Sequence, residues 1–284
     1  MNGAFAWPAP AKLNLFLHIL GRRYDGYHEL QTVFQFLDHG DTLRFTSRDD
    51  AAIVRAPGFE AVPEADDLCV KAARLLQQSL RAPRGVEIAL EKKLPMGAGL
   101  GGGSSNAATT LVALNLLWEA GRTTEQLAEL GRRLGADVPV FVRGHAAWGE
   151  GVGEILKPVE PTERWFLVVT PDVAVSTREI FEAPELPRDA ARIDWRDFLA
   201  GRTRNDCEAT VAARHPEVRR ALDWLAERAP ARMTGTGASV FAAFEDEPGA
   251  RAALAQVPSP WRGFVARSRN ESPLHVAAAA WAKQ

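Results

Sequence analysis

Residues 94–106 read LPMGAGLGGGSSN, and a run rich in helix-forming residues, 107–118, follows directly. Glycine loses more backbone entropy on ordering than any other residue, so a tract this dense needs a reason. We interpret it as a loop whose backbone amides approach a ligand closely. A glycine-rich turn before a helix combines unpaired N–H groups with the positive end of the helix dipole, which favours phosphate. The tract therefore predicts a nucleoside triphosphate site.

This tract differs from two common phosphate-binding motifs. The P-loop requires a lysine followed by serine or threonine, whereas Ser104 and Ser105 occupy those positions. The dinucleotide motif GxGxxG fits by letter from Gly97, but we find no acidic residue placed to hold a ribose. The alternative is a flexible linker or a simple helix cap. Two hydroxyls at the start of a strong helix argue against that alternative.

Composition excludes several classes of function. A chain of 284 residues is long enough for two domains, and 46% hydrophobic with 25% charged residues is typical of a soluble globular protein. A net charge of −2 gives no general attraction to nucleic acid or to a membrane surface. Cys69 and Cys207 form neither a metal motif nor a disulfide framework, which predicts a reducing cytoplasm. Residues 1–10 lack the features of a signal peptide, and no apolar run is long enough to span a bilayer.

Hydrophobic periodicity predicts an α+β fold, because hairpins and helices are mixed without strict β-α alternation. We expect strands at 11–20, 32–37, 42–46, 85–90, 165–170, 240–244 and 263–267, with a turn at 38–41. We expect helices at 67–80, 107–118, 124–134, 178–181, 195–199, 218–229 and 250–255, with Thr124 as an N-cap. The segment PVEPT at 158–162 is the candidate boundary between two units, 1–160 and 161–284.

Two charged residues stand inside apolar segments. Lys12 lies within the first strand, where its charge cannot remain unpaired. It either extends to solvent from an edge strand or orients an acceptor hydroxyl. Asp137 precedes the apolar run VPVF, and is either a cap or turn residue or a general base and charge partner of Lys12. A second glycine turn, 233–238, is either a tight turn or part of the same site. Together these segments suit phosphoryl transfer.

The same segments resemble the GHMP kinase superfamily, whose central motif is a Pro-x-x-x-Gly-Leu-Gly-Ser-Ser loop. The resemblance is strongest to members with a cytidyl substrate, and it spans nearly the whole chain. It rests on PAKLN at 10–14, DGYH at 25–28, GLGGGSSNAA at 99–108, GADVP at 135–139, MTGTG at 233–237 and NESPLH at 270–275.

The resemblance implies a two-domain GHMP kinase fold. Its N-terminal domain would be like domain 2 of ribosomal protein S5, and its C-terminal domain would be ferredoxin-like. The implied reaction is ATP-dependent phosphorylation of a hydroxyl on a small cytidyl substrate of isoprenoid precursor synthesis. ATP and Mg²⁺ are the implied cofactors, and we leave the metal ligands unassigned. We expect no nucleic-acid or membrane partner, and a monomer or weak homodimer.

Each site residue takes its role from the same resemblance. Asp137 would be the general base, Lys12 would hold Asp137 and the hydroxyl, and Asn14 would steady the substrate. Around the cytosine, Tyr27 would stack on one face, Phe181 would cover the other, and His28 would hydrogen-bond the edge. Thr177 and Lys92 would line the same pocket, with Lys93 as an alternative to its neighbour. The residues around the ATP phosphates would be Pro95, Met96, Gly97, Ala98, Gly99, Leu100, Gly101, Gly102, Gly103, Ser104 and Ser105.

Two other functions stay open on the sequence. One is a GHMP kinase that acts on homoserine or mevalonate, and Tyr27, His28 and Phe181 argue against it because those substrates carry no base. The other is a nucleotide-binding protein without catalysis. Lys12 and Asp137 argue against that function, since binding alone does not require both residues.

Overall fold

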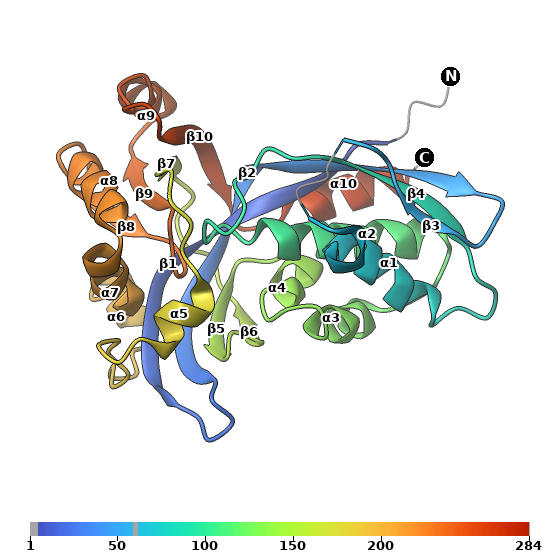
Figure 1. The fold of residues 1–284 in the computed structure, drawn as a ribbon, viewed down its shortest axis with the longest axis horizontal. Coiled ribbons are helices and arrows are strands. Elements are labelled where there is room, and N and C mark those ends of the chain that lie inside the picture. Colours follow the sequence, from blue (N-terminus) through green and yellow to red (C-terminus); the bar gives the residue numbers. More distant parts are fainter. Residues whose placement is uncertain (1–4, 59–61, 284) are drawn as a thin grey trace.

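The computed structural model describes residues 5–58 and 62–283 of the chain (Figure 1). Its strands are β1 (Trp7–Arg22), β2 (His28–Arg48), β3 (Ile53–Arg55), β4 (Gly85–Glu91), β5 (Ala147–Gly151), β6 (Ile155–Pro158), β7 (Trp165–Thr170), β8 (Ala231–Met233), β9 (Val240–Phe244) and β10 (Arg262–Arg269). Its α-helices are α1 (Leu68–Gln77), α2 (Gly102–Leu117), α3 (Thr124–Arg132), α4 (Val138–Arg143), α5 (Thr177–Glu182), α6 (Trp195–Leu199), α7 (Asp206–Arg214), α8 (Pro216–Ala226), α9 (Glu247–Leu254) and α10 (Pro273–Trp281).

A long antiparallel pair, β1 and β2, runs through the centre of the molecule (Figure 1). Strands β3, β4, β5 and β6 extend it on one side of the molecule, where α1 to α4 pack. On the other side, β7, β8 and β9 lie with α5 to α9. Strand β10 joins the two halves, because it pairs with β7 along most of its length and with β2 at its end.

The segment 38–41, which we expected to be a turn, lies within strand β2. We expected strands at 32–37 and 42–46 separated by a turn at 38–41, whereas one strand runs through all three segments. The polar residues that suggested a turn are held by tertiary contacts instead. Gly40 pairs with Pro10 of β1, and a Cβ there would come 2.1 Å from a backbone oxygen of β1. Asp38 accepts a hydrogen bond from the backbone N–H of Arg267 at 2.8 Å.

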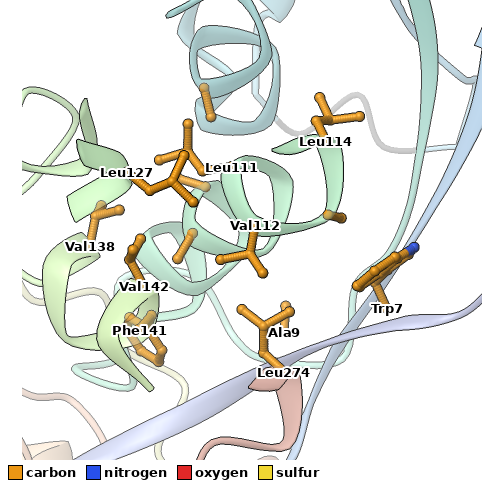
Figure 2. Packing of buried hydrophobic residues seen from close by; sticks show 14 of the residues in the cluster. Trp7, Ala9, Leu111, Val112, Leu114, Leu127, Val138, Phe141, Val142 and Leu274 are labelled. Atoms are coloured by element: carbon orange, nitrogen blue, oxygen red, sulfur yellow. The ribbon is translucent and has the colours of Figure 1, made fainter. Parts of the chain in front are cut away.

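The N-terminal half is organised around α2, whose residues 105–114 are all buried. Figure 2 shows this core. Its labelled side chains are Trp7, Ala9, Leu111, Val112, Leu114, Leu127, Val138, Phe141, Val142 and Leu274. A second core, formed mainly by β7 to β9, α5, α7 and α8, supports the other half. The predicted boundary at 158–162 falls between β6 and β7, and the units 1–160 and 161–284 stay a prediction.

The last helix, α10, lies on the N-terminal core although it ends the chain. Leu274 is fully buried in that core, and the ring of Trp281 lies 6.1 Å from the ring of Trp7. We did not predict α10, α7 or α4 from the sequence. The N-cap of α3 is also corrected, because Thr123 and Gln126 form a reciprocal capping box one residue before the expected Thr124.

Other expectations agree closely with the structure. The segments 165–170 and 240–244 are β7 and β9 with unchanged bounds, and 195–199 is α6. In the part of the chain that the structure describes, no helix has the length and apolar character needed to cross a bilayer.

Candidate active site

A cavity of about 570 Å³ lies between β1, the glycine-rich loop, the N-terminus of α4 and helix α5. That volume suits a small organic ligand. Most of the residues singled out from the sequence meet here, although they come from segments far apart in the chain. They are Lys12, Asn14, Lys92, Asp137, Thr177 and Phe181, together with every residue from Pro95 to Ser104.

The glycine-rich loop ends in the first turn of α2, which begins at Gly102. The capping residue, Gly101, has φ +71°, a left-handed conformation that favours glycine. Because the first N–H groups of a helix have no partner within it, the start of α2 presents free donors to the cavity. Ser104 lines the cavity, whereas Ser105 is buried behind it and its N–H donates to the carbonyl of Gly101 at 2.8 Å.

Contact with the second glycine turn explains why the loop has its shape. At Gly99, φ is +74°, and a Cβ would lie 2.2 Å from the carbonyl oxygen of Thr234. The Thr234 hydroxyl donates to the Gly99 carbonyl at 3.3 Å and accepts from the N–H of Asn14 at 2.9 Å. The N–H of Ser239 donates to the carbonyl of Ala98 at 3.2 Å. The second glycine turn and Ser239, which follows it, therefore contact the glycine-rich loop, and Thr234 also contacts β1.

Lys12 and Asp137 form an ion pair at the wall of this cavity. The Lys12 Nζ lies 3.3 Å from Asp137 Oδ2, and it donates to the Gly99 carbonyl at 3.2 Å and to Asn14 Oδ1. Lys12 is only 3% exposed, so it does not extend to solvent from an edge strand. The Asp137 side chain is 32% exposed, and within the described residues it makes no capping hydrogen bond to α4. The carboxylate is therefore accessible from the cavity.

A second ion pair fixes the strand end that leads into the loop. Lys92 Nζ lies 2.6 Å from Oδ2 of Asp41, whose side chain is fully buried. The other Asp41 oxygen accepts from the N–H groups of Lys93 and Leu94, both at 2.8 Å. The Lys93 side chain instead pairs with Glu91 at the surface. Of the two adjacent lysines, Lys92 is thus the one that lines the cavity. Its partner in β2 is distant in the chain, and no local motif marks it.

Replacing the buried carboxylate by Asp41→Asn is expected to destabilise the protein by about 2–4 kcal/mol. The change leaves the Lys92 ammonium without its anion and replaces charge-assisted hydrogen bonds by weaker ones. Urea unfolding measures the effect. The control is Glu129→Gln, which breaks an exposed pair with Arg132 and should leave the unfolding midpoint unchanged. Equal midpoints for the two variants would show that Asp41 does not stabilise the fold.

Of the ring-bearing residues expected around a base, Phe181 lines the cavity, whereas Tyr27 and His28 do not. Phe181 lines the cavity from α5, and Thr177 of the same helix shares a 2.8 Å hydrogen bond with Thr236 of the second glycine turn. The ring of His28 is buried and stacks on Phe181, with centroids 5.0 Å apart and planes 22° apart. Tyr27 is 64% exposed. Neither Tyr27 nor His28 is among the residues that line the cavity, and His28 adjoins it through its stacking contact with Phe181.

Burial, followed by the positive charge of Arg188, lowers the pKa of His28. The Arg188 Nε donates to His28 Nε2 at 3.0 Å. We did not single out Arg188 from the sequence, because its partner is distant in the chain and no local motif marks it.

Comparison with known proteins assigns the family. The model described as the GHMP kinases N terminal domain matches residues 67–145, and that described as GHMP kinases C terminal matches residues 185–263. The chain therefore belongs to the GHMP kinases, and it is an enzyme that transfers a phosphoryl group. This confirms the resemblance and the α+β, two-domain GHMP kinase fold predicted from the sequence.

Within this family, the chain is most informatively compared with relatives that share one enzyme name. The chain is 58% identical over 271 residues to the 4-diphosphocytidyl-2-C-methyl-D-erythritol kinase of Tolumonas auensis, covering 95% of each protein. It is 60% identical over 267 residues to the enzyme of that name from Alkalilimnicola ehrlichii, covering 94% of this chain and 92% of the relative.

Solved structures agree with this assignment. A crystal structure of 4-(cytidine 5'-diphospho)-2C-methyl-D-erythritol kinase matches with a TM-score of 0.80 at 32% identity, over 93% of this chain and 99% of that one. The mevalonate kinase of Methanococcus jannaschii matches with a TM-score of 0.68 at 16% identity, over 94% and 99%, and so shares the fold.

Proposed function

We propose that this enzyme uses ATP to phosphorylate the 2-hydroxyl of 4-diphosphocytidyl-2-C-methyl-D-erythritol, in the non-mevalonate synthesis of isoprenoid precursors. One observation carries the chemical part of this proposal: the Lys12–Asp137 pair faces the same cavity as the N-terminus of α2. The choice of substrate is supported by two relatives that are named as kinases of this cytidyl alcohol. Each is identical to this chain at more than half of the aligned residues.

In the proposed reaction, Asp137 acts as the general base. Its carboxylate accepts the proton of the acceptor hydroxyl while that oxygen bonds to the γ-phosphorus. The bond from the γ-phosphorus to the β,γ-bridging oxygen breaks, and ADP leaves. Lys12 holds the Asp137 carboxylate at 3.3 Å and stands where it can orient the hydroxyl. Asn14, bonded to Lys12 and Thr32, fixes the position of that ammonium group.

The ATP phosphates are proposed to lie on the loop from Pro95 to Ser105 and the first turn of α2. Mg²⁺, when bound, neutralises charge on the phosphate oxygens. Among the described residues no cluster of three metal-binding side chains exists. Magnesium in such sites rests on phosphate oxygens, water and one or two protein oxygens, so the residues fit an ion brought by the nucleotide. The Ser104 hydroxyl, on the cavity wall in the first turn of α2, is a protein oxygen that would help to hold it.

A side-by-side assay of ADP release with the cytidyl substrate, homoserine and mevalonate tests the proposed acceptor. We expect turnover with the cytidyl substrate and background rates with the other two. Turnover with homoserine or mevalonate alone would replace the proposed acceptor while leaving the kinase chemistry intact.

Replacing His28 by alanine is expected to raise KM for the cytidyl substrate by about tenfold or more, with little change in KM for ATP. The reason is that His28 stacks on Phe181, which lines the cavity from α5, and neither residue belongs to the glycine-rich loop. Steady-state kinetics with each substrate varied in turn measures the split. Equal rises in both KM values would contradict a role in recognising the base.

The remaining expectations belong to the same proposal. We propose a cytoplasmic enzyme that acts as a monomer or weak homodimer on a small molecule, without nucleic acid. Both cysteines are buried free thiols, which agrees with a reducing compartment. Light scattering across a range of concentrations tests the oligomeric state.

A further inference from the structure

Arg188 forms hydrogen bonds with three segments beside the cavity: β2, the end of α5 and the residues that follow α5. It lies between α5 and α6, and its guanidinium donates four hydrogen bonds. Nε donates to Nε2 of His28 at 3.0 Å. One terminal nitrogen donates to the carbonyls of Phe181 and Ala183 at 2.9 and 2.7 Å, and the other to that of Leu186 at 3.0 Å. A planar group with donors in a fixed fork thus connects β2 to the end of α5.

The first of these bonds decides which nitrogen of His28 carries a proton. An arginine side chain has donors and no acceptor, and it stays protonated in proteins. Nε2 of His28 must therefore accept, and it holds no proton. A ring that lacks a proton on Nε2 is neutral, and burial and the Arg188 charge favour that form because they lower the pKa of His28. A neutral ring with an unprotonated Nε2 carries its hydrogen on Nδ1.

The bonds to α5 fix the other ring of the pair. The last carbonyls of a helix have no partner within it, and Arg188 satisfies those of Phe181 and Ala183 at the end of α5. At the opposite end of this short helix, Thr177 is bonded to Thr236. Phe181 is thereby held against His28, with 5.0 Å between ring centroids.

The segment that carries Arg188 is itself tied to the central strands. The N–H of Ala190 donates to the carbonyl of Ile19 in β1 at 3.0 Å. The N–H of Ile193 donates to the side-chain oxygen of Gln31 in β2 at 3.0 Å. These bonds hold the Arg188 backbone close to the strand from which His28 projects, so the guanidinium reaches His28 without spanning a long loop.

We propose that Arg188 is a positioning residue for recognition of the pyrimidine base, which keeps His28 as an Nδ1–H donor and holds Phe181 against it. This inference rests on the proposed cytidyl substrate. In that form the His28 side chain donates to an acceptor atom of a base. It does not accept from an exocyclic amino group. A pyrimidine ring nitrogen or carbonyl oxygen is the kind of acceptor that this donor fits.

The test compares Arg188→Met and Arg188→Lys with the native enzyme. Arg188→Met keeps an unbranched side chain but removes every donor. We expect ¹⁵N NMR to show Nδ1–H for His28 in the native enzyme and a mixture of tautomers in Arg188→Met. KM for the cytidyl substrate should rise by about tenfold, with KM for ATP unchanged. Arg188→Lys keeps one cation that can donate to Nε2, and should restore the tautomer and part of the affinity.

A matched control lies on α5 itself. Arg178 is 84% exposed in its side chain and pairs with Glu182, so Arg178→Met should change neither the tautomer nor KM. An unchanged His28 tautomer in Arg188→Met overturns the inference, and so does an equal loss of affinity for both substrates. The NMR measurement needs no substrate. If the native enzyme does not phosphorylate the cytidyl alcohol, the proposed function fails, and the tautomer result separately decides whether Arg188 controls His28.

Discussion

Asp137→Asn is expected to lower kcat by about 10²-fold or more, while binding of ATP stays near the native level. The amide has the size of the carboxylate and can still accept a hydrogen bond from Lys12, which lies 3.3 Å away. It cannot take the proton of the acceptor hydroxyl. The loss should therefore fall on kcat and leave the nucleotide site intact.

Steady-state kinetics combined with calorimetric titration of ATP separates these effects. Asp172→Asn serves as a control, since Asp172 is an exposed carboxylate outside the cavity. In a loose transition state for phosphoryl transfer, proton removal can contribute little. Near-native kcat in Asp137→Asn would therefore remove Asp137 as the base and reduce its role to holding Lys12.

Gly99→Ala is expected to weaken ATP binding by at least about tenfold and to destabilise the protein by about 2–4 kcal/mol. Two costs combine at this position. An alanine must adopt φ +74°, and its Cβ would lie 2.2 Å from the Thr234 carbonyl. Either the glycine-rich loop or the second glycine turn must move, and both border the cavity.

Gly97→Ala in the same loop separates the two costs. Its φ is +62°, but among the described residues no atom lies within 4 Å of the added Cβ. This variant should lose only about 1 kcal/mol, from the left-handed backbone. Urea unfolding and ATP titration of both variants test the argument. If Gly97→Ala is as damaging as Gly99→Ala, the contact with Thr234 is not what shapes the loop.

Much of the site could be predicted from the sequence because its signals are local. The glycine tract marks a loop before a helix through the backbone freedom of glycine, which needs no knowledge of distant residues. Lys12 and Asp137 attracted attention because a charge in an apolar segment requires a partner. The structure confirms that they are each other's partner. Their catalytic roles stay a prediction.

Other features could not be predicted because they depend on contacts between distant segments. The polar segment 38–41 has the composition of a turn, yet pairing with β1 and the burial of Asp41 against Lys92 make it part of a strand. The sequence of helix α10 has little amphipathic pattern that could predict it. The helix packs where Leu274 enters the N-terminal core.

The sequence by itself therefore determined the glycine-rich loop before a helix, the two charged residues that need partners, and the family, since each depends on residue type and short spacing. Only the tertiary structure decided how these parts meet. It placed Thr234 against Gly99, Lys92 against Asp41, and Arg188 against His28. Those pairs form because a buried polar group must find a partner wherever the fold brings one within reach, and that position is not encoded in any local pattern.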